Sequence, residues 1–325
     1  MTRSLIIFCF SFVLATLLFA CRKNLTTDKN TIPPVPATGM YITQQFSTAQ
    51  LTTYFNIPYS TRPNFNGIQY TSIATYATET GQPQLTMQMD IAVPPNATAA
   101  KKQPLIIVIH GGGFSGGQKE DFLDEARSYA RAGYVAATIN YRLTPNNQRN
   151  PALRLMAITH AAEDGMNAIR YLKANASLYN IDTSRIATVG SSAGGGISLV
   201  NAVEYNTLAG TVSDYNGFSS KVAGAISTGA TINDTSLAPN NSLLHFDRFD
   251  TPVLLFHTIG TDPTTGATWS ANVLATQSAI NASGNSCTIV AQPVNTHVVN
   301  LSVGGRYWDD EKKFLWEKLK LYQLL

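Results

Sequence analysis

The chain has 325 residues, of which 44% are hydrophobic and 13% charged, and its formal net charge at pH 7 is +3. This balance, with no stripe of lysine or arginine, excludes the electrostatic footprint of a nucleic-acid-binding protein, so we expect no nucleic-acid partner. Two of the three cysteines lie within the first 21 residues, which leaves Cys287 alone in the body and excludes an internal disulfide framework.

The N-terminal segment has the pattern of an export signal. Arg3 precedes a mainly apolar run over residues 5–19, which is shorter than the ~20 residues that a membrane-spanning helix needs. We therefore expect a signal peptide over residues 1–20, with an uncleaved membrane anchor as the alternative. The signal peptide would direct the protein out of the cytoplasm.

The end of this segment resembles the lipobox of bacterial lipoproteins, in which a cysteine becomes the lipidated first residue. Residues 18–21 read Leu-Phe-Ala-Cys, and Arg22 stands where aspartate would favour retention in the inner membrane. The resemblance implies a lipid on Cys21 that anchors the protein to a membrane, most simply the outer membrane. Residues 21–45 are polar and proline-rich, and we expect them to form a flexible tether before a single domain over 46–325.

Strands and helices are expected to alternate through this domain. The first two predicted strands, over 69–78 and 85–93, would form a hairpin. The run over 105–109 is apolar without alternation, as in a strand covered on both faces. Further strands are expected at 134–141, 185–189, 222–227, 253–256 and 287–291, and helices at 119–131, 151–174, 193–205, 267–282 and 308–322. This order predicts a mostly parallel central sheet with helices on both faces.

Two motifs follow predicted strands and carry the chemistry. The segment 190–194 reads Gly-Ser-Ser-Ala-Gly, in which Ser192 would lie on a strand-to-helix turn too tight for side chains two residues away. The segment 110–114 reads His-Gly-Gly-Gly-Phe. Its glycines allow the backbone to approach a substrate closely, so the N–H groups of Gly112, Gly113 and Ala193 are candidates for an oxyanion hole. Ser192 is the candidate nucleophile.

With these motifs, the chain resembles the esterase and lipase branch of the α/β-hydrolase superfamily over residues 68–322. The resemblance extends to Asn-Tyr-Arg-Leu at 140–143 and Ala-Ala-Glu-Asp at 161–164. It implies an α/β-hydrolase fold and a triad in the chain order serine, acid, histidine. We expect no cofactor and no metal ion, because the sequence has neither a dinucleotide or phosphate-binding fingerprint nor a metal-ligand spacing.

Three histidines follow Ser192, and their positions distinguish them. His297 follows the last predicted strand, where this fold places its base, whereas His257 ends the preceding strand and His245 lies before that strand. Asp262 lies on the loop after His257 and is the candidate acid, although the family usually has its aspartate four residues after that histidine and here the interval is five. The predicted triad is therefore Ser192, Asp262 and His297.

Arg142 and Asp164 are expected to form a structural ion pair. Asp164 falls on the alanine-lined face of the helix predicted over 151–174, where a lone carboxylate would be costly to bury. His160, one turn earlier on that helix, is expected to be a packing or surface residue.

The function expected from these residues is that of an exported serine carboxylic-ester hydrolase. The segment 230–251, where this fold often inserts a lid, is short, so the cap is expected to be small or absent. An open site and a lipid tether suit bulky substrates, such as acetyl or feruloyl esters on polysaccharides. Phe114, Tyr141 and Trp269 would either line the pocket or pack against the scaffold. A peptidase on the same fold and an inactive binding protein are the alternatives.

Overall fold

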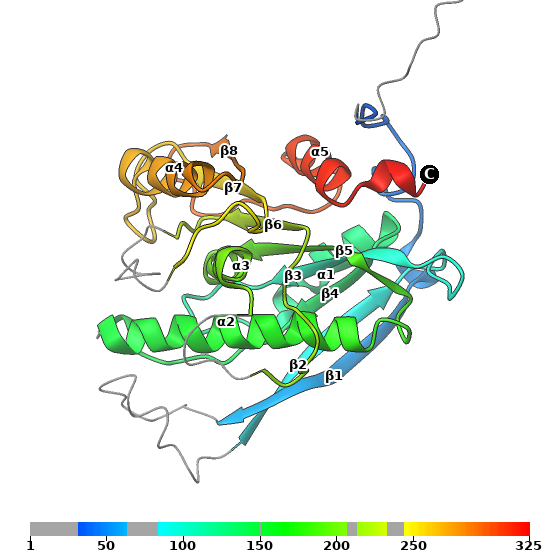
Figure 1. The fold of residues 1–325 in the computed structure, drawn as a ribbon, viewed down its shortest axis with the longest axis horizontal. Coiled ribbons are helices and arrows are strands. Elements are labelled where there is room, and N and C mark those ends of the chain that lie inside the picture. Colours follow the sequence, from blue (N-terminus) through cyan, green and yellow to red (C-terminus); the bar gives the residue numbers. More distant parts are fainter. Residues whose placement is uncertain (1–31, 64–83, 150, 207–212, 233–243) are drawn as a thin grey trace, which may run out of the picture. The chain divides into compact units, whose positions relative to one another are not determined.

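A computed structural model describes residues 32–325 except 64–83, 150, 207–212 and 233–243. Pro34–Leu325 form one compact unit, drawn in Figure 1. The predicted signal peptide, Cys21 and the strand predicted at 69–78 lie outside the described residues, as does half of the segment expected to be a short cap. Within the described part of the chain, none of the helices combines the length and apolar character needed to cross a bilayer.

An eight-stranded sheet forms the centre of the unit, in the order β1-β2-β4-β3-β5-β6-β7-β8. The pairs β1–β2 and β2–β4 are antiparallel, and all other neighbours are parallel. The strands are β1 (Thr52–Pro63), β2 (Gln84–Val93), β3 (Gln103–Ile109), β4 (Val135–Ile139), β5 (Ile181–Ser191), β6 (Gly224–Thr228), β7 (Val253–Thr258) and β8 (Cys287–Gln292). The predicted α/β architecture with a mostly parallel sheet is confirmed.

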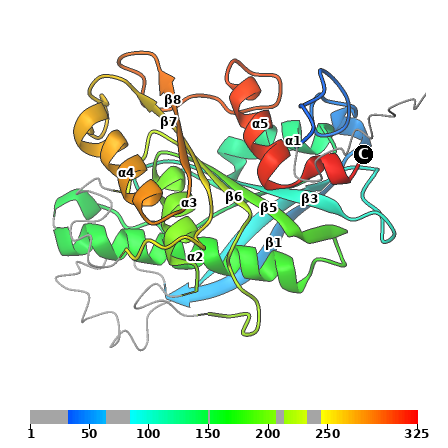
Figure 2. The same cartoon turned by 45° about the horizontal axis from the view of Figure 1, so that its top comes forward.

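Helices cover both faces of this sheet (Figures 1 and 2). One face packs against α1 (Leu123–Arg131) and α5 (Trp308–Lys318), and the other against α2 (Pro151–Ala174), α3 (Ala193–Glu204) and α4 (Leu274–Ala282). Short 3₁₀ or π turns occupy Thr48–Gln50, Lys119–Phe122, Asn147–Arg149, Trp269–Val273 and Leu321–Gln323.

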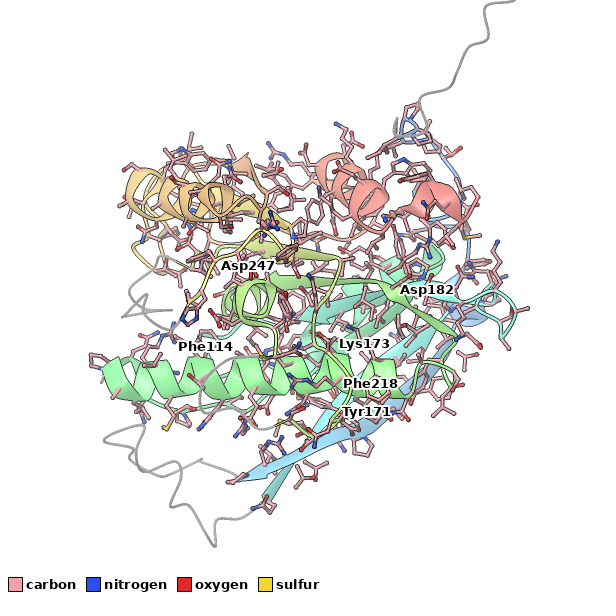
Figure 3. The ribbon with its side chains drawn as sticks, in the orientation of Figure 1. Phe114, Tyr171, Lys173, Asp182, Phe218 and Asp247 are labelled. Carbon is pink, nitrogen blue, oxygen red and sulfur yellow. The ribbon has the colours of Figure 1, made fainter. Side chains whose placement is uncertain are left out.

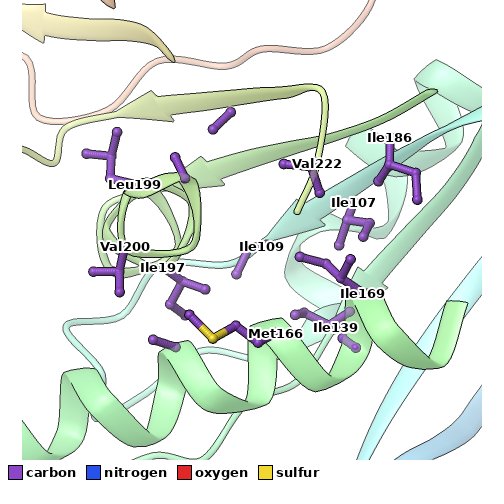
Figure 4. Packing of buried hydrophobic residues seen from close by; sticks show 14 of the residues in the cluster. Ile107, Ile109, Ile139, Met166, Ile169, Ile186, Ile197, Leu199, Val200 and Val222 are labelled. Carbon is purple, nitrogen blue, oxygen red and sulfur yellow. The ribbon is translucent and has the colours of Figure 1, made fainter. Parts of the chain in front are cut away.

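The apolar run of β3 explains why the sheet is covered on both sides. Every residue of β3 is buried, and successive side chains of a strand point to opposite faces. Ile107 and Ile109 pack into the core beneath α2 and α3, where Figure 4 shows Ile109 near Met166 and Ile107 near Ile169. Ile106 and Val108 belong to the separate core beneath α1 and α5.

The predicted tether ends too late at residue 45. Tyr41 and Ile42 are each 1% exposed, and the Tyr41 N–H donates a 2.7 Å hydrogen bond to the Ala132 carbonyl oxygen. The Tyr134 hydroxyl donates to the Tyr41 carbonyl oxygen at 3.0 Å. Burial of two large side chains outweighs the entropy of ordering this polar stretch, so the residues from Pro34 onward belong to the compact unit.

The edge strand β1 was not predicted. Its pairing with β2 is interrupted between Tyr54 and Ile57 and again between Pro58 and Ser60. These irregularities, together with several exposed positions, break the two-residue alternation that identifies a strand in a sequence. The strand Gln84–Val93 agrees with its prediction, and its hairpin partner is β1.

Candidate active site

The predicted site residues lie together at the carboxyl ends of the parallel strands. Ser192 directly follows β5, Asp262 follows β7, and His297 follows β8. The glycine segment 111–113 follows β3, the neighbour of β5 in the sheet. Ligands of open α/β sheets bind at this edge, because loops from several strands converge there.

The turn at Ser192 is strained, and the sequence around it accommodates the strain. Ser192 has φ 53° and ψ −117°, a conformation that non-glycine residues rarely adopt. A Cβ on Gly190 would lie 2.1 Å from the Gly194 carbonyl oxygen, and a Cβ on Gly194 would lie 2.1 Å from the Ile109 carbonyl oxygen. Only glycine fits at both positions, so the chain can turn sharply from β5 into α3 and present the serine side chain.

His297 bridges Ser192 and Asp262. Its Nε2 atom lies 2.8 Å from Ser192 Oγ, and its Nδ1 atom lies 2.8 Å from Asp262 Oδ2. Both distances are those of hydrogen bonds. The structure thus brings the three residues into one chain of contacts, with the Asp262 side chain fully buried and that of His297 16% exposed.

Asp262 is held as a charged acceptor. Its Oδ1 atom accepts hydrogen bonds from the backbone N–H groups of Thr264 at 2.9 Å and Thr265 at 2.8 Å. Burial by itself would raise the pKa of this carboxyl group. The hydrogen bonds from His297 and the two backbone N–H groups outweigh burial and lower the pKa below its ordinary value. Asp262 follows His257 by five residues where the family usually has four, and its carboxylate nevertheless lies within hydrogen-bond distance of His297.

The other two downstream histidines have different surroundings. His257 is completely buried. Its Nδ1 atom lies 3.1 Å from the Thr258 carbonyl oxygen, and its Nε2 atom lies 3.8 Å from Asp262 Oδ2, so the ring is a neighbour of the acid. His245 is exposed, and its Nδ1 lies 3.2 Å from Glu204 Oε1. Of these histidines, His297 alone is hydrogen-bonded to the Ser192 hydroxyl within the described residues.

The glycine loop lies beside Ser192 in a conformation that needs glycine. Gly112 has φ +105°, and a Cβ there would lie 2.0 Å from the Gly116 carbonyl oxygen. Gly113 has φ +62°. The His110 ring stacks on Tyr141 with a centroid separation of 4.2 Å, and the Tyr141 hydroxyl donates to the Gly111 carbonyl oxygen at 2.9 Å, so Tyr141 holds the start of the loop. Tyr141 is buried there, so it packs against the scaffold.

Arg154 and Asn147 both donate hydrogen bonds to the backbone of this loop, and neither residue was predicted from the sequence. Arg154 Nη1 donates to the Gly113 carbonyl oxygen at 2.8 Å, and Asn147 Nδ2 donates to the same oxygen at 3.0 Å. The guanidinium also lies 4.8 Å from the centroid of the Phe114 ring. Figure 3 shows Phe114 near the N-terminal half of α2, while Tyr171 and Lys173 lie toward its other end. A single arginine near the start of a helix is not part of any recognisable motif, so its contact with the loop could not be predicted from the sequence.

A cavity of about 850 Å³ opens over Ser192. Its walls come from the glycine loop, the start of α2 and the loops after β6, β7 and β8, and include Phe114, Phe122, Pro151, Thr264 and Val298. Among the three aromatic residues considered from the sequence, Phe114 lines this cavity. Trp269 is partly buried against the core. The described residues contain no cluster of three side chains suited to hold a metal ion.

A buried ionic cluster forms around Arg142, which directly follows Tyr141 in the chain. Arg142 Nε lies 2.9 Å from Asp164 Oδ2, and the Arg142 N–H donates to the same carboxylate at 2.7 Å. This is the ion pair expected from the sequence. Arg142 Nη2 also lies 3.1 Å from Glu163 Oε1, and Glu163 pairs with Arg62 on β1. His160 is buried one turn away, and burial lowers its pKa well below the ordinary value.

Curated relatives match parts of the chain. It is 38% identical over 110 residues to probable carboxylesterase 6 of Arabidopsis thaliana, which is 31% of this chain and 30% of that protein. It is 34% identical over 100 residues to carboxylesterase NlhH of Mycobacterium tuberculosis, which is 30% of this chain and 28% of that protein. The matched segments therefore span less than a third of either relative's length.

Solved structures share the fold at low identity. The apo form of esterase 2 from Thermogutta terrifontis superposes with a TM-score of 0.59 and 18% identity, covering 74% of this chain and 91% of that one. A truncated carbohydrate esterase from gut microbiota has the same TM-score and identity, covering 87% of this chain and 100% of that one. These likenesses show the α/β-hydrolase fold.

The BD-FAE family description matches residues 89–263, which is more than half of the chain. The matched range includes the glycine loop, Ser192 and Asp262, and ends before His297. Family membership agrees with the carboxylesterases among the relatives, and it supports the predicted class of ester hydrolase. The chain belongs to the BD-FAE family.

Proposed function

We propose that the protein is a serine carboxylic-ester hydrolase with Ser192, His297 and Asp262 as its triad. The observation that carries this proposal is the unbroken pair of 2.8 Å contacts from Ser192 Oγ through the His297 ring to Asp262, on the wall of a cavity. A serine hydroxyl needs a neighbouring base to become nucleophilic, and the base needs a partner that holds its ring.

In the first half of the reaction, Ser192 Oγ attacks the ester carbonyl carbon while His297 Nε2 takes the hydroxyl proton. The carbonyl oxygen becomes an anion, which would face the N–H groups of Gly112, Gly113 and Ala193; one such donor is worth roughly 2.7–4 kcal/mol of barrier. His297 then gives its proton to the departing alkoxide. The alcohol leaves, and the acyl group stays on Ser192.

In the second half, water takes the place of the alcohol. His297 removes a proton from the water as its oxygen attacks the acyl carbon. Collapse of this second intermediate breaks the bond to Ser192, and His297 returns the proton to Oγ as the carboxylic acid leaves. Asp262 stays charged throughout and stabilises the imidazolium. Its lowered pKa supports this role, because the carboxylate remains ionised at neutral pH.

We further propose acetyl or feruloyl groups on polysaccharides as the substrate class, reached from an exported, lipid-anchored position through Cys21. The volume of the cavity, about 850 Å³, lies in the upper part of the usual range of about 300–1,000 Å³ for ligand pockets, so an acyl group as large as feruloyl has room there. One protein with the same fold is a carbohydrate esterase from gut microbiota. Labelling of growing cells with radioactive palmitate tests the anchor: label should enter the parent protein and not the Cys21→Ala variant.

The hydrolase proposal is tested with a soluble protein that begins at Arg22. Hydrolysis of p-nitrophenyl acetate and longer acyl esters should fall at least 1,000-fold in Ser192→Ala, as expected when a triad nucleophile is removed. Ser184→Ala is the matched control, because it removes an exposed serine hydroxyl from the opposite half of the same strand.

The same proteins separate the alternatives. An alkylphosphonate probe should add its mass to Ser192 in the parent and leave Ser192→Ala unlabelled. A parent that cleaves peptides and no ester would indicate the peptidase. A folded parent that neither hydrolyses an ester or peptide nor takes up the probe would indicate a binding protein.

A further inference from the structure

The segment that carries His297 has few backbone hydrogen bonds of its own. His297 lies beyond the end of β8, in a stretch without helix or strand. Over residues 297–300, the Val299 N–H is the one backbone group that has a hydrogen-bond partner in the described part of the chain. That partner is Thr228 Oγ1, at 3.0 Å. The place of the His297 backbone therefore depends on this contact and on packing.

Thr228 also contacts the nucleophile. It is the last residue of β6, which lies beside β5 in the sheet, and its carbonyl oxygen accepts a hydrogen bond from the Ser192 N–H at 2.8 Å. Ser192 needs such an anchor because its backbone has an unfavourable positive φ. Thr228 thus holds the turn of the nucleophile through its main chain and the segment of the base through its side chain.

The Thr228 hydroxyl group is itself held in place. Thr228 is completely buried, and Gln292 Nε2, at the end of β8, donates to the same Oγ1 atom at 2.7 Å. The next residue, Gly229, has φ +75°, and a Cβ there would lie 2.3 Å from the His297 carbonyl oxygen. The end of β6 and the segment of the base therefore touch directly, with no room for a side chain between them.

A small shift of this segment would disturb the alignment of His297 with Ser192. His297 Nε2 lies 2.8 Å from Ser192 Oγ, and transfer of the hydroxyl proton requires the two atoms to stay within hydrogen-bond distance. Val299 is two residues from His297, so its hydrogen bond restrains the backbone next to the imidazole. Thr228 is not among the residues that line the cavity over Ser192. Its effect on the reaction would therefore pass through His297 and not through contact with the substrate.

We propose that Thr228 is a positioning residue, whose hydroxyl group holds His297 in line with Ser192 through the Val299 N–H. This inference rests on the proposed esterase function and adds to it a residue outside the triad and the glycine loop. The role belongs to the hydroxyl oxygen, because a side chain of the same shape without that oxygen would leave the Val299 and Gln292 donors without their partner.

Two variants separate the hydroxyl group from the shape of the side chain. Thr228→Val keeps the shape and should lower kcat for p-nitrophenyl acetate roughly 10- to 100-fold, with KM within about twofold of the parent, because a catalytic group is misplaced. Thr228→Ser keeps the hydroxyl group and should retain most of the parent's kcat. Thr188→Val is the matched control and should leave kcat unchanged, because Thr188 is equally buried in β5 and its hydroxyl has no partner among the described residues.

Thr228→Val can also lose stability, so a second variant tests the same contact from the side of the loop. Replacing Val299 by its α-hydroxy acid turns the backbone amide into an ester, which removes the N–H and keeps every side chain. This variant should lower kcat roughly tenfold. The same replacement at Val294 is the control, because the Val294 side chain is exposed and its N–H has no partner within the described residues.

The outcomes separate this role from the esterase function. An active parent whose kcat is unchanged by Thr228→Val or by the ester at Val299 would overturn the positioning role alone. Equal losses in Thr228→Val and Thr228→Ser would also overturn it, because the loss would then follow the shape of the side chain. A rise in KM at constant kcat would assign Thr228 to substrate binding and overturn the role as well. A parent that hydrolyses no ester would overturn the proposed function, and this role with it.

Discussion

Arg154 Nη1 lies 2.8 Å from the Gly113 carbonyl oxygen, and this contact joins the first turn of α2 to the glycine loop. The guanidinium also packs over Phe114, at 4.8 Å from the ring centroid. Glycines give the loop its unusual backbone angles and also make it flexible. A charged donor from a rigid helix restricts that flexibility, and we propose that this holds the N–H groups of the loop in place for a developing oxyanion.

We therefore expect Arg154→Met to lower kcat for ester hydrolysis by roughly 10- to 100-fold with little change in KM, because small displacements of catalytic groups have effects of that size. Steady-state kinetics with p-nitrophenyl acetate provide the measurement. Arg248→Met is the control, since Arg248 lies over the Phe249 ring at 4.6 Å, away from the cavity. A higher KM with unchanged kcat would show that Arg154 binds substrate and does not position the loop.

Gly194→Ala should destabilise the protein by roughly 2–4 kcal/mol and abolish esterase activity. The new Cβ would lie 2.1 Å from the Ile109 carbonyl oxygen, and inserting atoms into packed backbone typically costs 1–3 kcal/mol, occasionally more. Urea unfolding measures the free energy. Gly116→Ala is the comparison for stability, because its Cβ would meet only the Gly112 carbonyl oxygen, at 3.9 Å. Equal stabilities of the two variants would contradict the steric argument.

Removal of either partner of the Arg142–Asp164 pair should be costly. Arg142→Ala and Asp164→Ala are each expected to lower the free energy of unfolding by about 3–5 kcal/mol, because each removes one charge of a buried ion pair and leaves the other less compensated. Lys312→Ala breaks a pair with Asp309, whose side chain is 77% exposed, and should change stability far less than either buried variant, because water screens exposed ion pairs. Thermal and urea unfolding provide the measurement. Unchanged stability in both buried variants would refute the pairing.

Glu125 should make stability depend on pH between about 4.5 and 7. Burial raises its pKa from 4.5 to about 7, so the folded state binds this proton more tightly than the unfolded state does. The contribution is fully present below pH 4.5 and is lost as pH rises through 7. Glu125→Gln should therefore be more stable than the parent at pH 8, by at most about 3 kcal/mol, and this advantage should shrink by pH 5. An advantage independent of pH would exclude titration of Glu125 as its cause.

The regular elements of the interior were accessible from the sequence because their patterns are local. The uniform apolar run of β3 indicated a strand buried on two faces, and α2 begins at Pro151 and ends at Ala174 as predicted. The edge strand β1 and the buried pair Tyr41 and Ile42 were not predicted. Bulges remove the alternation of β1, and the polar residues around Tyr41 conceal a packing decided by distant partners such as Ala132.

By itself, the sequence determined the turn at Ser192 and the glycine loop, because each depends on the steric bulk of neighbouring residues along the chain. It also limited the choice of base and acid through chain order. Only the tertiary structure decided that His297 contacts Ser192, that Arg154 holds Gly113, and that Thr228 contacts the segment after His297. Those relationships join segments far apart in the chain, and their distances depend on how the strands and helices pack.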